Sequence, residues 1–185
     1  MNRQLARISV AAIAGLAMLL VACTDEPGTP TAGSTPTTTA DSSTTSAKPD
    51  AGALADVKPC DLLTSSEATG LNLTSPGEPD RVGGTDACDW SESGNGGLII
   101  GVNPTRGIED LDYRGEKTSP IKIGKYDATK VESHKGAKYV CHVVISVSNS
   151  SSVQAIGTLK ATSTDTVAAC ERATKAAELI APKLP

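Results

Sequence analysis

The stretch Lys138-Tyr-Val-Cys-His-Val-Val-Ile-Ser-Val147 gives the strongest indication of fold in this chain. Every second residue from Cys141 to Val147 is apolar, and a period of two is that of a β-strand with one face in the core. Alternation places Cys141 on the apolar face and His142 on the opposite face. The stretch therefore predicts a half-buried strand of a sheet.

The segment after this strand predicts a second strand and then a helix. Asn149-Ser150-Ser151 supplies turn residues, and residues 153–159 are expected to form an antiparallel partner strand. A long helix is expected from a cap at Ser163 to Asp165 as far as about Ala181, because Pro182 stops it. Its expected buried stripe is Val167, Cys170, Ala173, Ala177, Ile180 and Leu184.

The chain before residue 138 predicts one short helix and several short strands. Thr64 and Glu67 form a capping box that starts the helix, and Gly70 ends it. Residues 74–85 are rich in Gly, Pro and Asp and predict a loop. Expected strands cover residues 88–90, 98–102 and 122–129, the last range being two strands joined by a turn.

Together these elements predict an α+β fold. It is a mainly antiparallel sheet of five or six strands, with a short N-terminal helix and a long C-terminal helix packed on one face.

Residues 1–22 predict a lipoprotein signal peptide. Two arginines precede an apolar run of about 14 residues, which is short of the roughly 20 that span a bilayer. The run ends in Leu20-Val21-Ala22-Cys23, which resembles a bacterial lipobox. Cys23 is therefore the expected lipidation site. A diacylglyceryl group on it would anchor the protein to the extracytoplasmic side of the cell membrane.

The mature chain divides into a tether and one globular domain. Residues 23–56 hold the lipidated cysteine and a disordered stretch of Thr, Ser and Pro, whereas residues 57–185 have the length of a single domain. Loss of the signal peptide removes two arginines and no acid, so the net charge of −4 becomes −6. An acidic chain without a basic patch argues against nucleic acid as a partner.

Four cysteines remain after lipidation, and two disulfides are expected in an oxidising compartment. They are Cys60, Cys88, Cys141 and Cys170. Three pairings are possible. The hairpin brings the start of its first strand beside the end of its second, and the last helix folds back from there, which favours Cys141 with Cys170. Cys60 with Cys88 would be the other bridge.

The sequence contains no motif that predicts catalysis, a metal site or a cofactor. His134 lies in a polar segment and His142 faces away from Cys141, so both are expected to be exposed and solvated. Trp90 could line a ligand cleft, although packing in the core is the stronger expectation for a single tryptophan beside a cysteine. We therefore expect a protein that is not an enzyme.

The order of these features resembles a family of actinobacterial lipoproteins known as domain of unknown function 3558. The resemblance rests on the lipobox and tether, Pro59-Cys60-Asp61-Leu62-Leu63-Thr64 with Glu67 and Gly70-Leu71, Cys88-x-Trp90, Cys141 at the start of an apolar strand, and Cys170-x-x-Ala173 before Leu184-Pro185. It implies an envelope location and this organisation, and it implies no catalytic residue.

The function expected from the sequence is that of a cell-envelope lipoprotein acting as a non-enzymatic binding or accessory module. Its partner would be an envelope protein or an apolar small molecule. One alternative is a carrier of an apolar or lipid ligand held between sheet and helix, and another is an envelope hydrolase.

Overall fold

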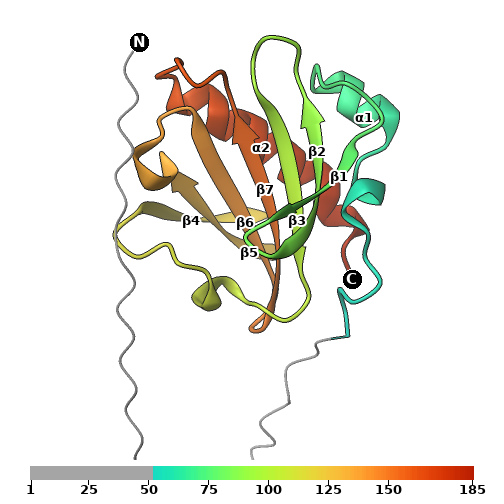
Figure 1. Ribbon diagram of the computed structural model, residues 1–185. Coiled ribbons are helices and arrows are strands. Elements are labelled where there is room, and N and C mark those ends of the chain that lie inside the picture. The colour runs from blue at the N-terminus through green and yellow to red at the C-terminus, as the bar shows by residue number, and fades with distance from the viewer. Residues whose placement is uncertain (1–51) are drawn as a thin grey trace, which may run out of the picture. The chain divides into compact units, whose positions relative to one another are not determined.

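The computed structural model describes residues 52–185. The predicted signal peptide, Cys23 and most of the predicted tether lie outside the described residues. Within them, seven strands form one antiparallel sheet in the order β1-β2-β3-β7-β6-β5-β4 (Figure 1). The strands are β1 (Glu78–Val82), β2 (Thr85–Ser91), β3 (Gly97–Asn103), β4 (Lys117–Ile123), β5 (Tyr126–Glu132), β6 (Val140–Ser148) and β7 (Ser151–Thr158).

The sheet consists of two meanders, β1-β2-β3 and β4 to β7, joined where β3 pairs with β7. The hairpin predicted around residue 149 is β6 and β7, and Val143 pairs with Ala155 in its centre. In this register Cys141, Val143 and Ile145 share one face of the sheet. The same face continues through Leu98 and Ile100 of β3, and all five side chains are fully buried.

The prediction of five or six strands is wrong, because the supposed loop of residues 74–85 contains a seventh strand, β1. Four of its five residues are exposed, and the second is Pro79. The strand lies at the sheet edge, where a proline and charged side chains are tolerated because one row of backbone groups has no partner strand. It therefore lacks the apolar alternation that indicates a strand in a sequence. Gly83 and Gly84 both adopt positive φ in the two-residue turn to β2.

Helix α2 (Thr166–Ile180) covers one face of the sheet, over β6 and β7 (Figure 1). Its first turn is capped by Asp165, whose Oδ1 accepts a hydrogen bond from the Ala168 backbone N–H at 3.0 Å. Its buried residues are Ala169, Cys170, Ala173, Ala176, Ala177 and Ile180. The prediction that Val167 is buried is wrong: it is 68% exposed. The buried face of the helix includes Ala169 and Ala176, which the predicted stripe left out. The centre of that face therefore lies farther from Val167 than predicted.

A close approach of helix and sheet occurs at Gly157 in β7. A Cβ atom there would lie 2.4 Å from the carbonyl oxygen of Ala169 and 2.8 Å from the backbone nitrogen of Ala173. At this point the helix therefore rests on the backbone of the sheet, and the helix residues in contact are Ala169 and Ala173.

The N-terminal part of the domain packs against the same core, beside residues of β2 and β3. The 3-10 helix η1 (Pro59–Leu62) leads into α1 (Ser65–Gly70), where Thr64 and Glu67 form the capping box. Leu54, which precedes the predicted domain boundary, is 1% exposed and belongs to the core. The packed structure thus begins before residue 57.

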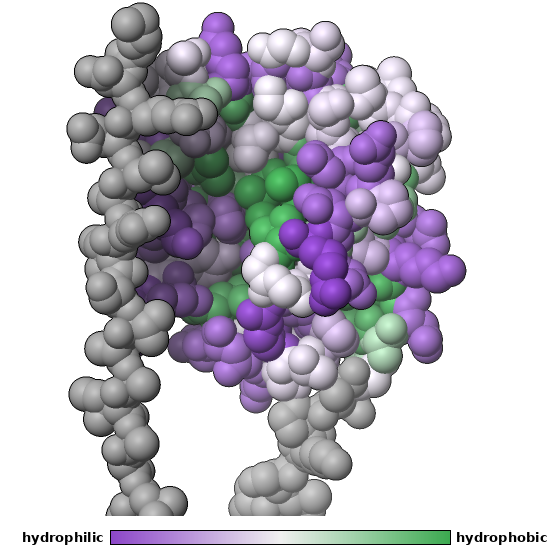
Figure 2. All heavy atoms as spheres, viewed as in Figure 1, coloured by the Kyte–Doolittle hydropathy of each residue, from purple (hydrophilic) through white to green (hydrophobic). Residues whose placement is uncertain are grey.

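The sheet face turned away from α2 is the one seen in Figure 1. Apolar residues gather in the middle of this face, with hydrophilic residues on either side (Figure 2). Within residues 52–185, no helix is long and apolar enough to cross a membrane.

Candidate functional site

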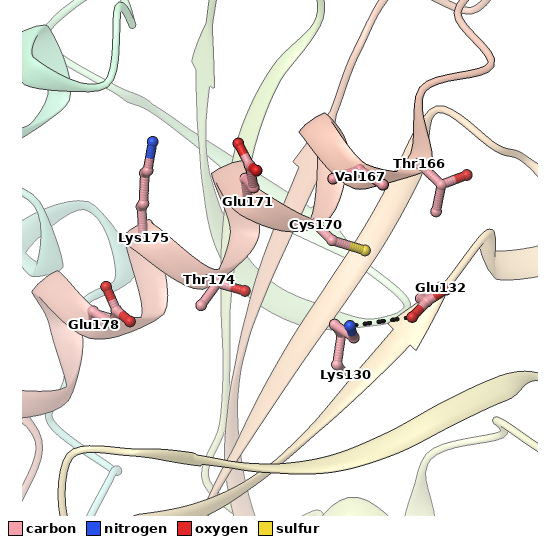
Figure 3. A pocket seen from close by; sticks show the side chains of 9 residues that line it. All are labelled: Lys130, Glu132, Thr166, Val167, Cys170, Glu171, Thr174, Lys175 and Glu178. Atoms are coloured by element: carbon pink, nitrogen blue, oxygen red, sulfur yellow. Dashed lines mark ion pairs between the residues drawn. The ribbon is translucent and has the colours of Figure 1, made fainter.

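A groove of about 520 Å³ runs between α2 and strand β5 (Figure 3). We call it the α2–β5 groove. Its lining residues are Lys130, Glu132, Thr166, Val167, Cys170, Glu171, Thr174, Lys175 and Glu178. The groove exists because α2 lies over β6 and β7, which leaves the neighbouring strand β5 uncovered on the same side of the sheet.

One wall of the groove is formed by residues of α2 that are spaced three or four positions apart. Val167, Glu171, Thr174 and Glu178 follow one another at intervals of three or four residues, so their side chains share one side of α2. Lys130 and Glu132 are two residues apart in β5 and therefore point to the same face of the sheet. The groove is thus lined by one side of a helix and one face of a strand.

Five of the nine lining residues of the groove are charged, and both signs are present. The floor carries an ion-pair network in which Glu132 contacts the Nζ atoms of Lys117 at 2.5 Å and Lys130 at 3.1 Å. Hydrogen bonds from these two lysines, Lys117 first, hold the pKa of Glu132 below its usual value. Glu171 and Lys175 on the helix are exposed. Such a surface suits a polar partner with charges of its own better than a hydrocarbon chain.

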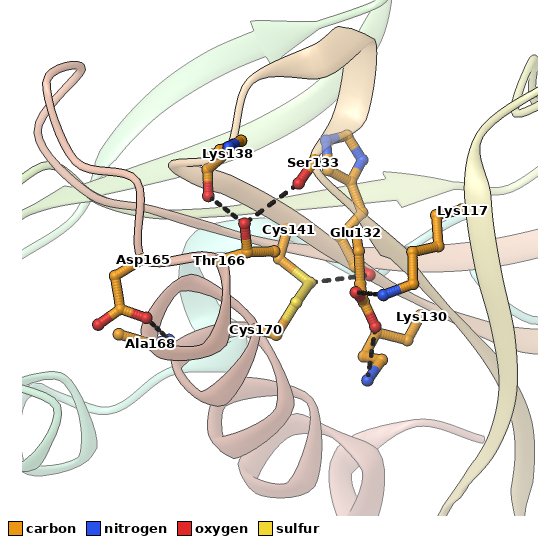
Figure 4. The surroundings of a disulfide bond; sticks show 11 residues. Lys117, Lys130, Glu132, Ser133, Lys138, Cys141, Asp165, Thr166, Ala168 and Cys170 are labelled. Carbon is orange, nitrogen blue, oxygen red and sulfur yellow. Dashed lines mark hydrogen bonds and ion pairs between the residues drawn. A yellow bond between two sulfur atoms is a disulfide. The ribbon is translucent and has the colours of Figure 1, made fainter.

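The disulfide of Cys141 and Cys170 fixes the first turns of α2 to β6 at one end of the groove (Figure 4). Thr166 reinforces this attachment: its hydroxyl donates to the carbonyl of Lys138 at 2.9 Å and lies 3.1 Å from Ser133 Oγ. The helical wall is therefore held in place by a covalent bond as well as by packing, which gives the groove a preformed shape.

Both disulfides have the pairing expected from the sequence. Cys60 bonds to Cys88, and Cys141 bonds to Cys170. Trp90 is 1% exposed and packs beside Gly77, close to the sulfur of Cys88. It is a core residue, so it does not line a ligand cleft.

The expectation of exposed histidines is wrong for His142, which is 7% exposed, and for His134, whose side chain is 20% exposed. His142 lies on the sheet face opposite Cys141, as the alternation predicts, but Tyr113 covers it. The Tyr113 hydroxyl lies 3.0 Å from His142 Nδ1 and 3.2 Å from Gln154 Oε1, to which it donates. The ring of His134 is centred 4.5 Å from that of His142.

Burial decides the chemistry of this cluster. It lowers the pKa of His142 to about 3, with smaller contributions from His134 and Lys135, and it raises the pKa of the Tyr113 hydroxyl. A neutral imidazole with so low a pKa is a weak base, and a tyrosine with a raised pKa is a weak nucleophile. The cluster is suited to holding the segment around Tyr113 against the sheet.

The described residues contain no cluster of side chains that could bind a metal ion. No group of three or more His, Cys, Asp or Glu side chains within residues 52–185 is placed to bind one. The sequence did not predict the α2–β5 groove, since its residues come from a strand and a helix that lie far apart in the chain. The only local signal was the position of Val167 at the edge of the apolar stripe.

The fold and its groove define a class of protein: a disulfide-linked antiparallel sheet with one covering helix and a polar surface groove. A family model described as "Protein of unknown function (DUF3558)" matches residues 18–183, which is most of the chain. The chain belongs to this family. No curated protein and no solved structure matches it.

Proposed function

We propose that the protein is a cell-envelope lipoprotein, anchored by lipid on Cys23 and exposed on the outer side of the cytoplasmic membrane. The signal peptide pattern of residues 1–22 and the lipobox before Cys23 support this proposal. The disulfides Cys60–Cys88 and Cys141–Cys170 support it independently, because such bridges persist in oxidising compartments and are rare in the cytosol. The resemblance to actinobacterial lipoproteins agrees with the same location.

The activity we propose is non-enzymatic binding of a partner protein of the envelope through the α2–β5 groove. The observation that carries this proposal is a preformed groove of about 520 Å³ lined by charged side chains of both signs. A segment of a partner protein can match such a surface charge by charge.

The contacts between α2 and the sheet argue against a carrier of apolar ligands. Such a carrier needs a cavity between sheet and helix. Ala173, Ala176 and Ala177 on the inner side of α2 are fully buried, and Gly157 leaves less than a methyl group of space beneath the helix. A lipid would have to push the helix away from a sheet to which Cys170 ties it.

Site-specific photo-crosslinking in the host tests the binding role. A photoreactive residue replaces Thr174, which lies in the groove and is partly exposed, and a matched control replaces Asp127, which is exposed on β5 but outside the groove. We expect a product of defined mass from position 174 only, weakened when Lys175→Glu reverses a charge of the wall. Equal products from both positions, or none from position 174, would contradict a groove that binds protein.

Mass analysis of the protein from host membranes tests the anchor separately. We expect a chain that begins at Cys23 with acyl groups on its sulfur. The Cys23→Ala variant should lose the lipid mass and keep residues 1–22. An intact N-terminus on the unaltered chain would refute the anchoring proposal and leave the binding proposal open to its own test.

A further inference from the structure

A second, smaller pocket lies at the other end of the sheet, between the β1–β2 turn and the segment after β3. Its volume is about 350 Å³. The lining residues whose side chains carry charge or hydrogen bonds are Arg81, Thr85, Asp86, Asn103 and Arg106. We call it the arginine pocket. It shares no residue with the α2–β5 groove.

Asn103 is the key residue of the arginine pocket. Its side chain is 1% exposed, and its Oδ1 accepts hydrogen bonds from Thr85 Oγ1 at 2.6 Å and from Arg106 Nη2 at 2.9 Å. A guanidinium can only donate, so this contact fixes which end of the amide is oxygen. The amide nitrogen Nδ2 is consequently a donor, and it is buried without a hydrogen-bond partner in the described part of the chain.

A buried donor without an acceptor destabilises the folded protein, so an acceptor from outside the chain would stabilise this arrangement. The neighbouring side chains indicate what kind of acceptor fits. Arg106 is half-buried and makes its hydrogen bonds to Thr85, Asn103 and the Gly83 carbonyl through Nη2 alone, as far as residues 52–185 are concerned. Its Nε–H and Nη1 donors remain for a ligand.

Arg81 adds a second positive charge at the rim. Its Nη2 donates to the carbonyl of Gly84 at 3.0 Å, and its Nε lies 3.5 Å from the carboxylate of Asp86. Two guanidinium groups against one carboxylate leave an excess of positive charge in a chain whose net charge is −4. Donors with excess positive charge match the oxygen atoms of an anion.

We infer that the arginine pocket binds an oxyanion, the carboxylate or phosphate group of a small ligand. The anion accepts hydrogen bonds from Asn103 Nδ2 and from the guanidinium of Arg106, while Arg81 contributes charge. This site is independent of the proposed partner groove, and neither proposal requires the other.

Titration of the full chain in detergent, labelled with ¹⁵N, tests the inference. Sodium phosphate and sodium acetate are added separately, with sodium chloride keeping the ionic strength constant. We expect saturable shifts of the Asn103 side-chain NH₂ and Arg106 Nε–H resonances, at a lower concentration of one anion than of the other. The anion that saturates at the lower concentration identifies the group as phosphate or carboxylate.

Charge-matched variants separate binding from general attraction. Arg106→Gln should weaken the affinity by about tenfold, since it removes a charge-assisted donor. Arg106 also holds the β1–β2 turn through the Gly83 carbonyl. A second variant, Arg81→Gln, keeps the hydrogen bonds of Arg106, loses one bond from an exposed side chain to the Gly84 carbonyl, and should weaken binding severalfold. The control is Arg114→Gln, which removes the same charge from a side chain that is 92% exposed and paired with Asp112 outside the pocket.

Three results would overturn the inference. One is a shift that is absent from both series or that rises linearly and equally with phosphate and with acetate. Another is an affinity that falls as much in Arg114→Gln as in Arg81→Gln. The third is unchanged affinity in Arg106→Gln and Arg81→Gln. Each of these results would mean that the pocket binds no anion. Arg106 would then only hold the β1–β2 turn in place, and water would occupy the space beside Asn103.

Discussion

At the scale of single residues, His142 couples the stability of the fold to pH. An unfolded histidine takes up its proton near the ordinary pKa of 6.5, whereas burial lowers the pKa of His142 in the folded protein to about 3. Between these values the unfolded state binds the extra proton. The free energy of unfolding therefore falls as pH falls through this window, and well below pH 6.5 the slope is about 1.4 kcal/mol per pH unit.

Urea unfolding at a series of pH values from 7 to 5 measures this slope, since Glu67 and Glu132, whose pKa values are lowered from 4.5, titrate below that range. His142→Gln should be less stable at pH 7 but should lose most of the pH dependence. His134→Gln leaves His142 buried and should keep it. A slope that survives in His142→Gln would show that another group is responsible.

The burial of His142 also shows what a sequence pattern can and cannot predict. Alternation along β6 correctly placed it on the face opposite Cys141. The residue that covers it, Tyr113, is 29 positions away in the chain and has no local pattern to mark it. The side of the sheet on which a residue lies follows from its position within the strand. Whether the residue is buried depends on which distant parts of the chain pack over that side.

At the scale of elements, the contact between α2 and the sheet depends on Gly157. A methyl group at this position would overlap backbone atoms of Ala169 and Ala173, which cannot turn aside as a flexible side chain could. Gly157→Ala should therefore force α2 away from β7 and lower the free energy of unfolding by about 2 kcal/mol. Thermal and urea unfolding of the purified variant measure the loss.

Gly101→Ala is the matched control, because it makes the same change inside a neighbouring part of the sheet. A Cβ atom at Gly101 would lie 3.8 Å from Thr85 Cγ2, which is ordinary contact. This variant should stay within about 0.5 kcal/mol of the original protein. Equal losses in the two variants would mean that any side chain added to these strands is harmful, and that the approach of α2 is not the cause.

Elements with a buried face were predictable from the sequence, and those without one were not. The hairpin of β6 and β7 and the helix after it followed from apolar periodicity, and the capping residues Thr64 and Asp165 marked where helices begin. Strand β1 has no buried face and takes its place by pairing with β2. The α2–β5 groove escaped prediction for a related reason, since it is the part of the sheet face that the helix leaves uncovered.

At the scale of the whole molecule, the two disulfides join the ends of the domain to its sheet. Cys60 ties the N-terminal segment to β2, and Cys170 ties α2 to β6, across sequence separations of 28 and 29 residues. Each bridge adds about 3 kcal/mol in the chain-entropy account. The pairing was predictable because hairpin geometry brings Cys141 and Cys170 together and leaves one partner for Cys60.

The start of the folded domain was harder to predict, because the composition of the tether changes gradually into that of the domain. Leu54 lies before the expected boundary at residue 57, yet it is 1% exposed and belongs to the same core as Trp90. A turn precedes η1: the backbone N–H of Val57 donates to the carbonyl of Leu54 at 3.2 Å. The packed structure therefore includes a residue that its composition assigns to the tether.

Two soluble fragments test this boundary. A fragment of residues 57–185 should have a free energy of unfolding about 2–4 kcal/mol lower than one of residues 52–185, because it leaves the site of Leu54 empty. Leu54→Ala in the longer fragment should reproduce most of the loss, and Leu54→Met, which keeps the volume, should cost less than about 1.5 kcal/mol. Urea unfolding of all four proteins measures these differences. Equal midpoints for the two fragments would place Leu54 outside the cooperative unit and return the boundary to residue 57.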